Sequence, residues 1–181
     1  VEKYGQDHPE YYPIIDGKRL LPEPGKRGGW QPCLSNTETV DVAADAIVEY
    51  FDKNPHTETF SLGANDSSGY CECSACTVKD KGRRNFIGRR SYSNIYFDWA
   101  NEVVENVLKV HPDKWVGCFA YSELAEPPTH TKVHPRIVPF LTYDRLKWID
   151  PELETFGRAL TRRWSSSSFV LGWYEYLYGT P

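Results

Sequence analysis

The chain has 181 residues, of which 21 are basic and 25 acidic, so its formal net charge is −4. This balance gives no overall electrostatic case for binding nucleic acid or an anionic membrane. The length suits one domain with a sizeable core, and no repeat or low-complexity tract divides it. Because methionine is absent even at position 1, we expect residues 1–181 to be a single-domain fragment of a longer protein.

The first predicted helix lies after an irregular segment, residues 1–31, that is rich in proline and glycine. Ser35 and Glu38 have the spacing of a capping box, and apolar residues follow at helical intervals until Asn54-Pro55. An apolar run over residues 60–64 then predicts a strand, and the polar cluster at 65–69 predicts a turn after it.

A second helix is predicted over residues 93–110, after a basic loop at 79–90. The near-continuous apolar run 115–121 is typical of a strand that is covered on both faces. Residues 137–141 form a further short apolar run, although Pro139 cannot donate a hydrogen bond to a neighbouring strand. Asp150-Pro151-Glu152 then marks a helix start. We expect a loop at 165–168 and a last strand at 169–174.

The resulting order is helix, strand, helix, strand, strand, helix, strand, which favours a parallel α/β architecture. Four strands are too few to close an eight-stranded barrel. The prediction is therefore a partial (β/α)8 TIM-type barrel with crossover helices, and a small open doubly wound sheet is the alternative.

Carboxylates follow the C-terminal end of every predicted strand, where barrel enzymes build their active sites. The four candidate catalytic residues are Asp66, Glu123, Asp144 and Glu175. Aromatic residues lie beside them, namely Tyr121, Tyr143, Trp173, Tyr174 and Tyr176. Two carboxylates in an aromatic cleft suit glycoside hydrolysis. The alternative for each acid alone is structural: a turn for Asp66, a solvated loop for Glu123 and Asp144, and an arginine pair for Glu175.

The cysteines form a second group. Cys71, Cys73 and Cys76 have compact ligand spacing, and Cys33 could complete a tetrahedral structural zinc site. The alternative is one or two disulfides in a secreted protein. Cys118 lies within a predicted strand and is interpreted as a small buried apolar residue.

The basic loop could bind an acidic saccharide such as a uronate or a sulfated sugar, because arginine matches carboxylate and sulfate oxygens. Its alternative is a solvated surface loop. Its basic residues are Lys79, Lys81, Arg83, Arg84, Arg89 and Arg90. His8 lies in a proline-rich segment and is a candidate substrate contact.

Several motifs together resemble the bacterial domain-of-unknown-function barrels related to the α-glucuronidases. The motifs are His8-Pro9-Glu10-Tyr11-Tyr12, Gly17-Lys18-Arg19, Cys33, residues 61–66 running into Cys71-Glu72-Cys73-Ser74-Ala75-Cys76, Ala120-Tyr121 and Pro127-Pro128. The resemblance covers most of the chain, and the Asn-Asp plus C-x-C-x-x-C block is its most specific part.

The resemblance implies a glycoside-hydrolase-like barrel to which this chain contributes middle and later strands. We expect the full-length protein to be secreted or periplasmic. The resemblance also implies an oligo- or polysaccharide substrate, the remainder of the barrel as a partner, and no organic cofactor. By strand order, Asp66 would be the general acid, where the family usually has a glutamate. Asp144 and Glu175 would activate water, and Glu123 would be a substrate contact or alternative acid. From the residues themselves, the candidate substrate-binding residues are His8, Asn65, Tyr121, Tyr143, Trp173 and Tyr174.

Two hypotheses follow. The first is a glycosidase that uses these carboxylates. The second is a non-catalytic carbohydrate-binding barrel, stabilised by a four-cysteine zinc site, in which the acids only hydrogen-bond sugar hydroxyls.

Overall fold

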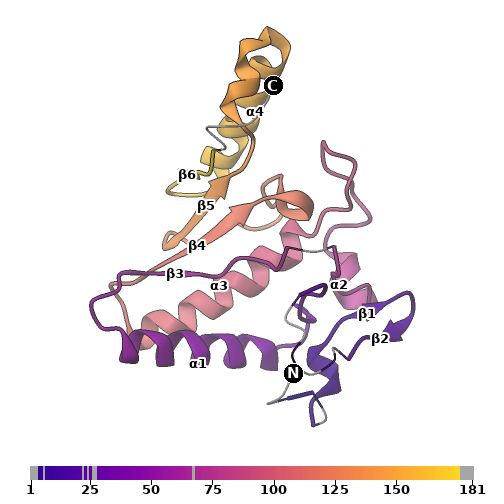
Figure 1. Ribbon diagram of the computed structural model, residues 1–181, viewed down its shortest axis with the longest axis vertical. Helices are drawn as coiled ribbons and strands as arrows, with labels where there is room; N and C mark the ends of the chain where they lie inside the picture. Colours follow the sequence, from indigo (N-terminus) through magenta and orange to yellow (C-terminus); the bar gives the residue numbers. More distant parts are fainter. Residues whose placement is uncertain are drawn as a thin grey trace.

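The computed structural model describes residues 4–5, 7–21, 23, 25, 28–66 and 68–175. Its helices are α1 (Glu38–Lys53), α2 (Ser74–Val78), α3 (Ser93–Val110) and α4 (Pro151–Ser167), with short 3-10 helices η1 (Pro9–Tyr11), η2 (Ser122–Leu124) and η3 (Arg145–Ile149). Its strands are β1 (Ile14–Ile15), β2 (Lys18–Arg19), β3 (Thr59–Ser61), β4 (Trp115–Ala120), β5 (Ile137–Leu141) and β6 (Gly172–Trp173) (Figure 1).

The central sheet has four strands in the order β3-β4-β5-β6, and every neighbouring pair is parallel. Helices α3 and α4 connect β3 to β4 and β5 to β6, whereas the connection from β4 to β5 contains only η2. The prediction of a parallel α/β architecture is therefore confirmed. Strand order along the sheet follows chain order, as in a barrel wall.

Strand β5 forms despite Pro139. The carbonyl of Leu141 accepts from the amide of Tyr174, so odd-numbered residues of β5 direct their main-chain groups towards β6. Pro139 therefore lacks its donor on the β6 side, where pairing involves only Phe140 and Leu141. The last strand is shorter than the predicted 169–174.

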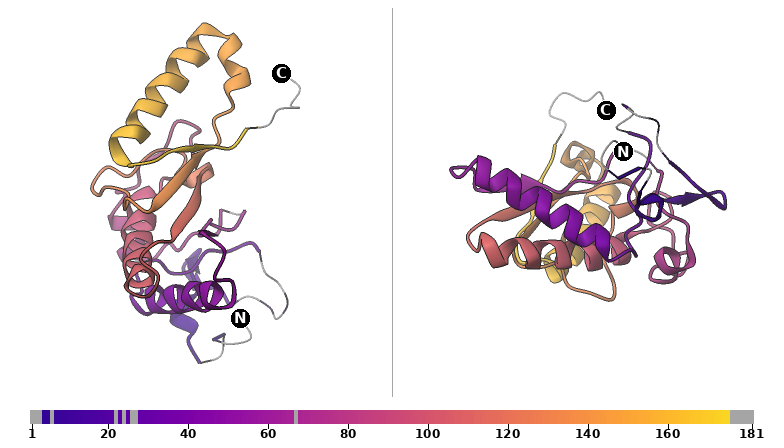
Figure 2. Two further views of the ribbon diagram at one scale, coloured as in Figure 1. Left: turned by 90° about the vertical axis from the view of Figure 1, so that its left-hand side faces the viewer. Right: turned by 90° about the horizontal axis from the view of Figure 1, so that it is seen from below.

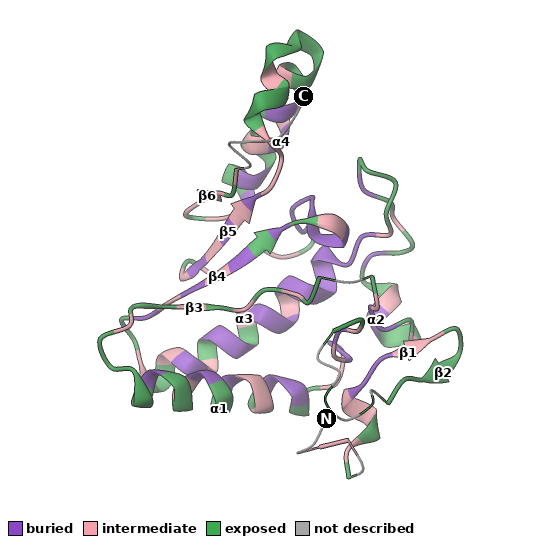
Figure 3. Cartoon of the chain, viewed as in Figure 1, coloured by how far each residue is buried: buried purple, intermediate pink, exposed green. Residues whose placement is uncertain are grey.

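The core lies between one face of the sheet and the helices. Val116, Cys118 and Ala120 of β4 are buried in the cluster that includes Phe51 of α1 and Val103 of α3. Helix α3 lies alongside α1 below the sheet, and α4 extends from the other end of the molecule (Figures 1 and 2). Buried residues are concentrated on the inner sides of α1 and α3 (Figure 3).

The opposite sheet face is lined by alternate residues. Trp115, Phe119, Val138 and Phe140 border a cavity of about 340 Å³ there, and the Phe119 side chain is exposed. A doubly wound sheet has helices on both faces. Within the described residues, the core helices pack on one face only, an arrangement compatible with a partial barrel.

The N-terminal segment contains a small hairpin that the sequence analysis missed. Strands β1 and β2 pair antiparallel around Asp16-Gly17, whose φ angles are 48° and 73°. These positive values are those of a type I′ turn, for which Asp-Gly is a favoured pair. The signal was present in the sequence, but the strands are too short to show an alternating pattern.

Two local predictions are wrong. Ser35 does not cap α1; instead the Asn36 side chain accepts from the Glu38 amide at 2.9 Å. Residues 165–167 are the last turn of α4 rather than a loop. The Ser166 and Ser168 hydroxyls donate to the carbonyls of Arg162 and Trp164, bonds that are compatible with continued helix.

Candidate functional site

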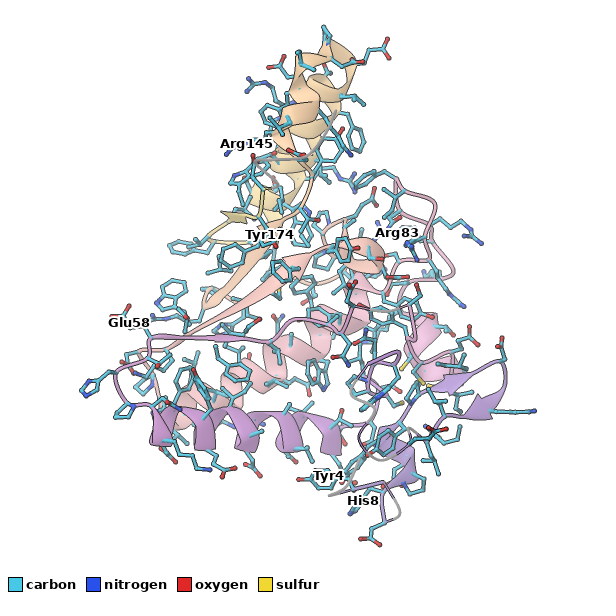
Figure 4. All side chains as sticks on the ribbon, in the orientation of Figure 1. Tyr4, His8, Glu58, Arg83, Arg145 and Tyr174 are labelled. Carbon is cyan, nitrogen blue, oxygen red and sulfur yellow. The ribbon has the colours of Figure 1, made fainter. Side chains whose placement is uncertain are left out.

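A cavity of about 240 Å³ lies at the C-terminal edge of the parallel sheet. Segments that follow β3, β4, β5 and β6 all contribute to it, as expected where the carboxyl ends of parallel strands meet. Its lining residues are Ala64, Asn65, Asp66, Tyr70, Phe119, Tyr121, Ser122, Glu123, Leu124, Thr142 and Tyr174. Tyr174, which is labelled in Figure 4, marks its position near the middle of the molecule.

Glu123 is placed in the cavity by a strained turn. Ser122 has a φ of 53°, a left-handed conformation that is uncommon for a residue other than glycine. The Asn85 side-chain amide donates to the Ser122 carbonyl at 2.6 Å, and the Tyr92 amide donates to the Glu123 carbonyl at 3.2 Å. Such strain persists only where neighbours hold it, and it is concentrated at functional sites.

The Glu123 side chain is 6% exposed and pairs with Arg89, whose Nη1 lies 3.3 Å from Oε1. The same Arg89 nitrogen donates to the Ser68 hydroxyl at 2.8 Å. The other carboxylate oxygen of Glu123, Oε2, is buried and has no hydrogen-bond partner among the described residues. A buried carboxylate oxygen without a donor is costly, and such atoms occur where a side chain has a functional role.

Among the residues that the structure describes, the other two buried acids, Asp80 and Glu126, are satisfied by the protein itself. Asp80 accepts from Ser91, Asn94 and the Ile95 amide, so it holds the start of α3. Glu126 pairs with Arg83 and Arg163. Neither carboxylate lines the cavity. Glu123 is therefore distinct from the buried acids that have structural roles.

The wall after β3 is held by the segment before α1. Gln31, 2% exposed, donates to the Asn65 carbonyl at 2.7 Å and accepts from the Asn65 amide at 2.9 Å. The Asn65 side chain donates to the Trp30 carbonyl at 2.8 Å. Asn65 thus lines the cavity while its side-chain amide also fixes the loop that carries Asp66.

Tyr70 also lines the cavity, and its ring stacks on that of Tyr92 with the ring centroids 4.5 Å apart. Burial raises the pKa of Tyr70 far above its ordinary value of 10.0, and the negative charge of Glu123 adds to this shift. Its phenol therefore remains protonated at neutral pH. The sequence analysis did not identify Tyr70, Ser122 or Thr142 as site residues, although all three line the cavity.

The structure brings five predicted site residues to the cavity: Asn65, Asp66, Tyr121, Glu123 and Tyr174. It places the other predicted residues elsewhere. Asp144 accepts from the Leu146 amide at 2.9 Å and caps η3. Glu175 pairs with Arg145 at 2.5 Å, and this arginine pair is the structural alternative that the sequence analysis gave for Glu175.

Tyr143 and Trp173 also lie outside the lining of this cavity. Tyr143 packs against Phe86 and Phe156, and Trp173 packs edge-on against Trp148. His8 stacks on Tyr11 and lies at the end of the molecule remote from Tyr174 (Figure 4). Its Nδ1 contacts Glu10 at 3.0 Å, and Glu38 completes a surface cluster with them. Tyr176 lies outside the described residues.

Several basic residues of the loop at 79–90 contact neighbouring groups of the protein. Lys79 pairs with Asp98, Arg83 with Glu126, and Arg84 donates to the Gly88 carbonyl. Arg89 differs because it joins the cavity acid Glu123 while its side chain stays 49% exposed.

Four cysteines gather between the N-terminal hairpin, the start of α1 and α2. The sulfur of Cys33 lies 3.6 Å from that of Cys71 and 3.9 Å from those of Cys73 and Cys76. A tetrahedral zinc ion with Zn–S bonds of 2.3 Å requires sulfur–sulfur separations of about 3.8 Å. The three separations from Cys33 are close to this value, and all four sulfurs lie within 4.8 Å of one another, an arrangement compatible with a metal site.

All five cysteines are free thiols, so the disulfide alternative is not formed in this structure. Hydrogen bonds from Cys71 and then Cys76 lower the pKa of the Cys33 thiol. Three of the four clustered cysteines are buried and Cys73 is half-buried. Cys118 lies apart, buried in β4, as predicted.

Within the part of the chain that the structure describes, no helix combines the length and apolar character needed to cross a membrane. Searches of curated proteins and of solved structures gave no significant match. A family model described as "Domain of unknown function (DUF4838)" matches residues 1–177. The chain therefore belongs to the DUF4838 family, and nearly all of its length lies within the family domain.

Proposed function

We propose that this chain is part of a carbohydrate-active barrel and that the cavity at the C-terminal edge of its sheet binds the saccharide. The observation that carries the proposal is Glu123. Its carboxylate is buried at the cavity wall, is held by Arg89, and has one oxygen with no donor among the described residues. A sugar hydroxyl is a donor of suitable size for that oxygen.

The rest of the lining fits a sugar ring. Phe119, Tyr121 and Tyr174 offer apolar ring faces, and Asp66 offers a second, exposed carboxylate. Aromatic faces pack against the C–H faces of sugars, whereas carboxylates accept from hydroxyls. The exposed part of Arg89 supports selection of an acidic sugar such as a uronate.

The barrel part of the proposal rests on the sheet. Strand order follows chain order, the core helices pack on one face, and the opposite face carries apolar side chains such as Phe119 and Phe140. In a closed barrel that face would be interior and filled by side chains from other strands. The remainder of the barrel is the partner that we propose for it.

In the complete barrel we propose that Glu123 and Asp66 are the two carboxylates of a glycoside hydrolase. One would protonate the leaving oxygen and the other would act as a nucleophile or activate water. Glu123, buried beside Arg89 and Tyr70, has the lower solvent access of the two.

The test is binding of uronate-containing and neutral oligosaccharides, measured by titration calorimetry on this chain, followed by hydrolysis assays on the longer protein. Glu123→Gln keeps the shape of the side chain but removes its charge. We expect it to weaken saccharide binding by about 10- to 100-fold, because a hydrogen bond to a charged group contributes about 1.5–3 kcal/mol.

Asp144→Asn is the matched control. It also neutralises one carboxylate, but that carboxylate caps η3 and does not line the cavity. Its saccharide affinity should equal that of the unaltered chain. If the two variants weaken binding equally, or if neither does, Glu123 is not the saccharide contact.

A second candidate is a non-catalytic carbohydrate-binding barrel that contains structural zinc. The sulfur–sulfur separations around Cys33, 3.6 to 3.9 Å, favour the zinc part of this candidate. Cys33, Cys71, Cys73 and Cys76 would hold the ion. With four thiolate ligands, zinc has no open position for substrate, and it would supply a cross-link rather than catalysis.

A further inference from the structure

Ser35 occupies the first position of the capping-box pattern in the sequence, but its side chain does not cap α1. The Asn36 side chain accepts from the Glu38 amide at the start of α1, and the Ser35 side chain makes no capping hydrogen bond. Ser35 is half-buried and its hydroxyl turns instead towards the cysteine cluster.

The Ser35 hydroxyl oxygen lies close to three sulfurs at once. Its distances are 3.4 Å to Cys33, 3.4 Å to Cys73 and 3.3 Å to Cys76. These nearly equal distances place it over the triangular face that the three sulfurs form. The fourth sulfur, that of Cys71, accepts from the Ile14 amide at 3.3 Å.

The charge of a loaded site explains why such donors matter. Four thiolates around a divalent ion leave a net charge of −2 in a largely buried place, which is costly unless hydrogen-bond donors compensate it. Thiolates cannot donate, so in that state the Ser35 hydroxyl must be the donor. Outer donors of this kind orient the ligands and tune the metal.

We propose that Ser35 is a positioning residue of the metal site: its hydroxyl donates to the thiolates of Cys33, Cys73 and Cys76 in turn. Together with the Ile14 amide, it places a donor within reach of each of the four ligands, and it covers one face of the ion. This inference rests on the proposed metal site, and it assigns Ser35 a role that is separate from helix capping.

The experiment titrates the metal-free chain, reduced and under anaerobic conditions, with Co²⁺ and then displaces Co²⁺ with Zn²⁺. Tetrahedral thiolate coordination of Co²⁺ gives ligand-field bands in the visible and charge-transfer bands in the near ultraviolet. In Ser35→Ala we expect Co²⁺ affinity to fall by about 10-fold or more and the charge-transfer bands to shift, because outer-shell changes typically cost 10- to 100-fold.

Ser35→Thr and Ser35→Val form a matched pair, because the two side chains have nearly the same shape and only Thr has a hydroxyl. Thr should retain the affinity and the bands, whereas Val should lose both. This pair decides the question if Ser35→Ala does not fold. Asn36→Ala removes the true cap of α1 and should leave Co²⁺ affinity and the bands unchanged.

The outcomes separate the two proposals. If the unaltered chain gives no thiolate bands with Co²⁺, the metal site fails and the inference fails with it. If the unaltered chain binds Co²⁺ but Ser35→Val and Ser35→Thr have the same Co²⁺ affinity and the same bands, only the role of Ser35 is overturned.

Discussion

At the residue scale, position in the structure separates side chains that look equivalent in the sequence. Asp66, Glu123, Asp144 and Glu175 all follow strands, yet only Asp66 and Glu123 line the cavity. Glu123 is further set apart by the strained Ser122 and by its Oε2 atom, which has no hydrogen-bond partner in the described part of the chain. The proposed function therefore depends on one turn whose geometry Asn85 maintains from a distant loop.

Gly69 is a second residue on which this site depends. A Cβ added there would lie 2.4 Å from the Gly29 carbonyl oxygen and 2.7 Å from the Trp30 Cα. Backbone atoms cannot yield as a flexible side chain does, so Gly69→Ala should lower the free energy of unfolding by about 1–3 kcal/mol. Urea denaturation measures this change.

Gly63→Ala is the control for that measurement. The nearest atom to its added Cβ is the Ser61 hydroxyl oxygen at 3.6 Å, an ordinary contact. We expect a change within about 0.5 kcal/mol at this position, as for most surface substitutions. Equal losses for both variants would show that segment 29–30 does not pack tightly on Gly69.

At the element scale, the cysteine cluster joins parts of the chain that lie far apart in the sequence. Cys33 precedes α1, Cys71 bonds the β1 strand through the Ile14 amide, and Cys76 lies in the short helix α2. Cys71 also follows Tyr70 in the chain, and Tyr70 lines the cavity at the C-terminal edge of the sheet. A metal ion at this cluster would fix the N-terminal hairpin and the cavity wall together.

Metal removal should therefore destabilise the fold. At free zinc 100-fold above its dissociation constant, binding adds about 2.7 kcal/mol to the free energy of unfolding. A chelator should remove this increment from the unaltered chain. Cys73→Ser should lack it from the start, and denaturation with and without zinc measures the difference.

Cys118→Ser is the matched control, because Cys118 is buried in β4 outside the cluster. It should lower stability through its buried hydroxyl and still respond to the chelator. A Cys73→Ser protein that keeps the full zinc response would contradict the four-cysteine site.

At the scale of the whole molecule, the two faces of the sheet differ. Val116 is 2% exposed and packs in the core between the sheet and the helices. Val138 is half-buried and borders the cavity of about 340 Å³ on the opposite face. The proposed barrel requires that second face to become interior in the longer protein.

A matched pair of valine-to-threonine substitutions tests this. Val116→Thr should cost about 1–3 kcal/mol in this chain, because it buries a hydroxyl. Val138→Thr should be nearly neutral here and as costly as Val116→Thr in the longer protein. If Val138→Thr stays neutral there too, the face remains open and the barrel proposal is wrong.

Local patterns in the sequence determined most of the elements. Helix α3 and strand β5 have the predicted bounds, and Asp150 caps α4 as expected, because caps, proline stops and apolar periodicity act over a few residues. The four-cysteine cluster was also predicted from spacing, since three of its members lie within six residues.

Tertiary structure alone decided which residues meet. Ser35 and Asn36 are adjacent polar residues whose side chains can both cap a helix. In the folded chain the Ser35 hydroxyl lies against the clustered sulfurs, and the Asn36 side-chain oxygen accepts from the Glu38 amide at the start of α1. Likewise, the path of each loop after its strand determines whether its acid enters the cavity, as Glu123 does, or bonds a local partner, as Asp144 and Glu175 do. Contacts between residues far apart in the chain determine these paths, and a periodic pattern contains no information about such contacts.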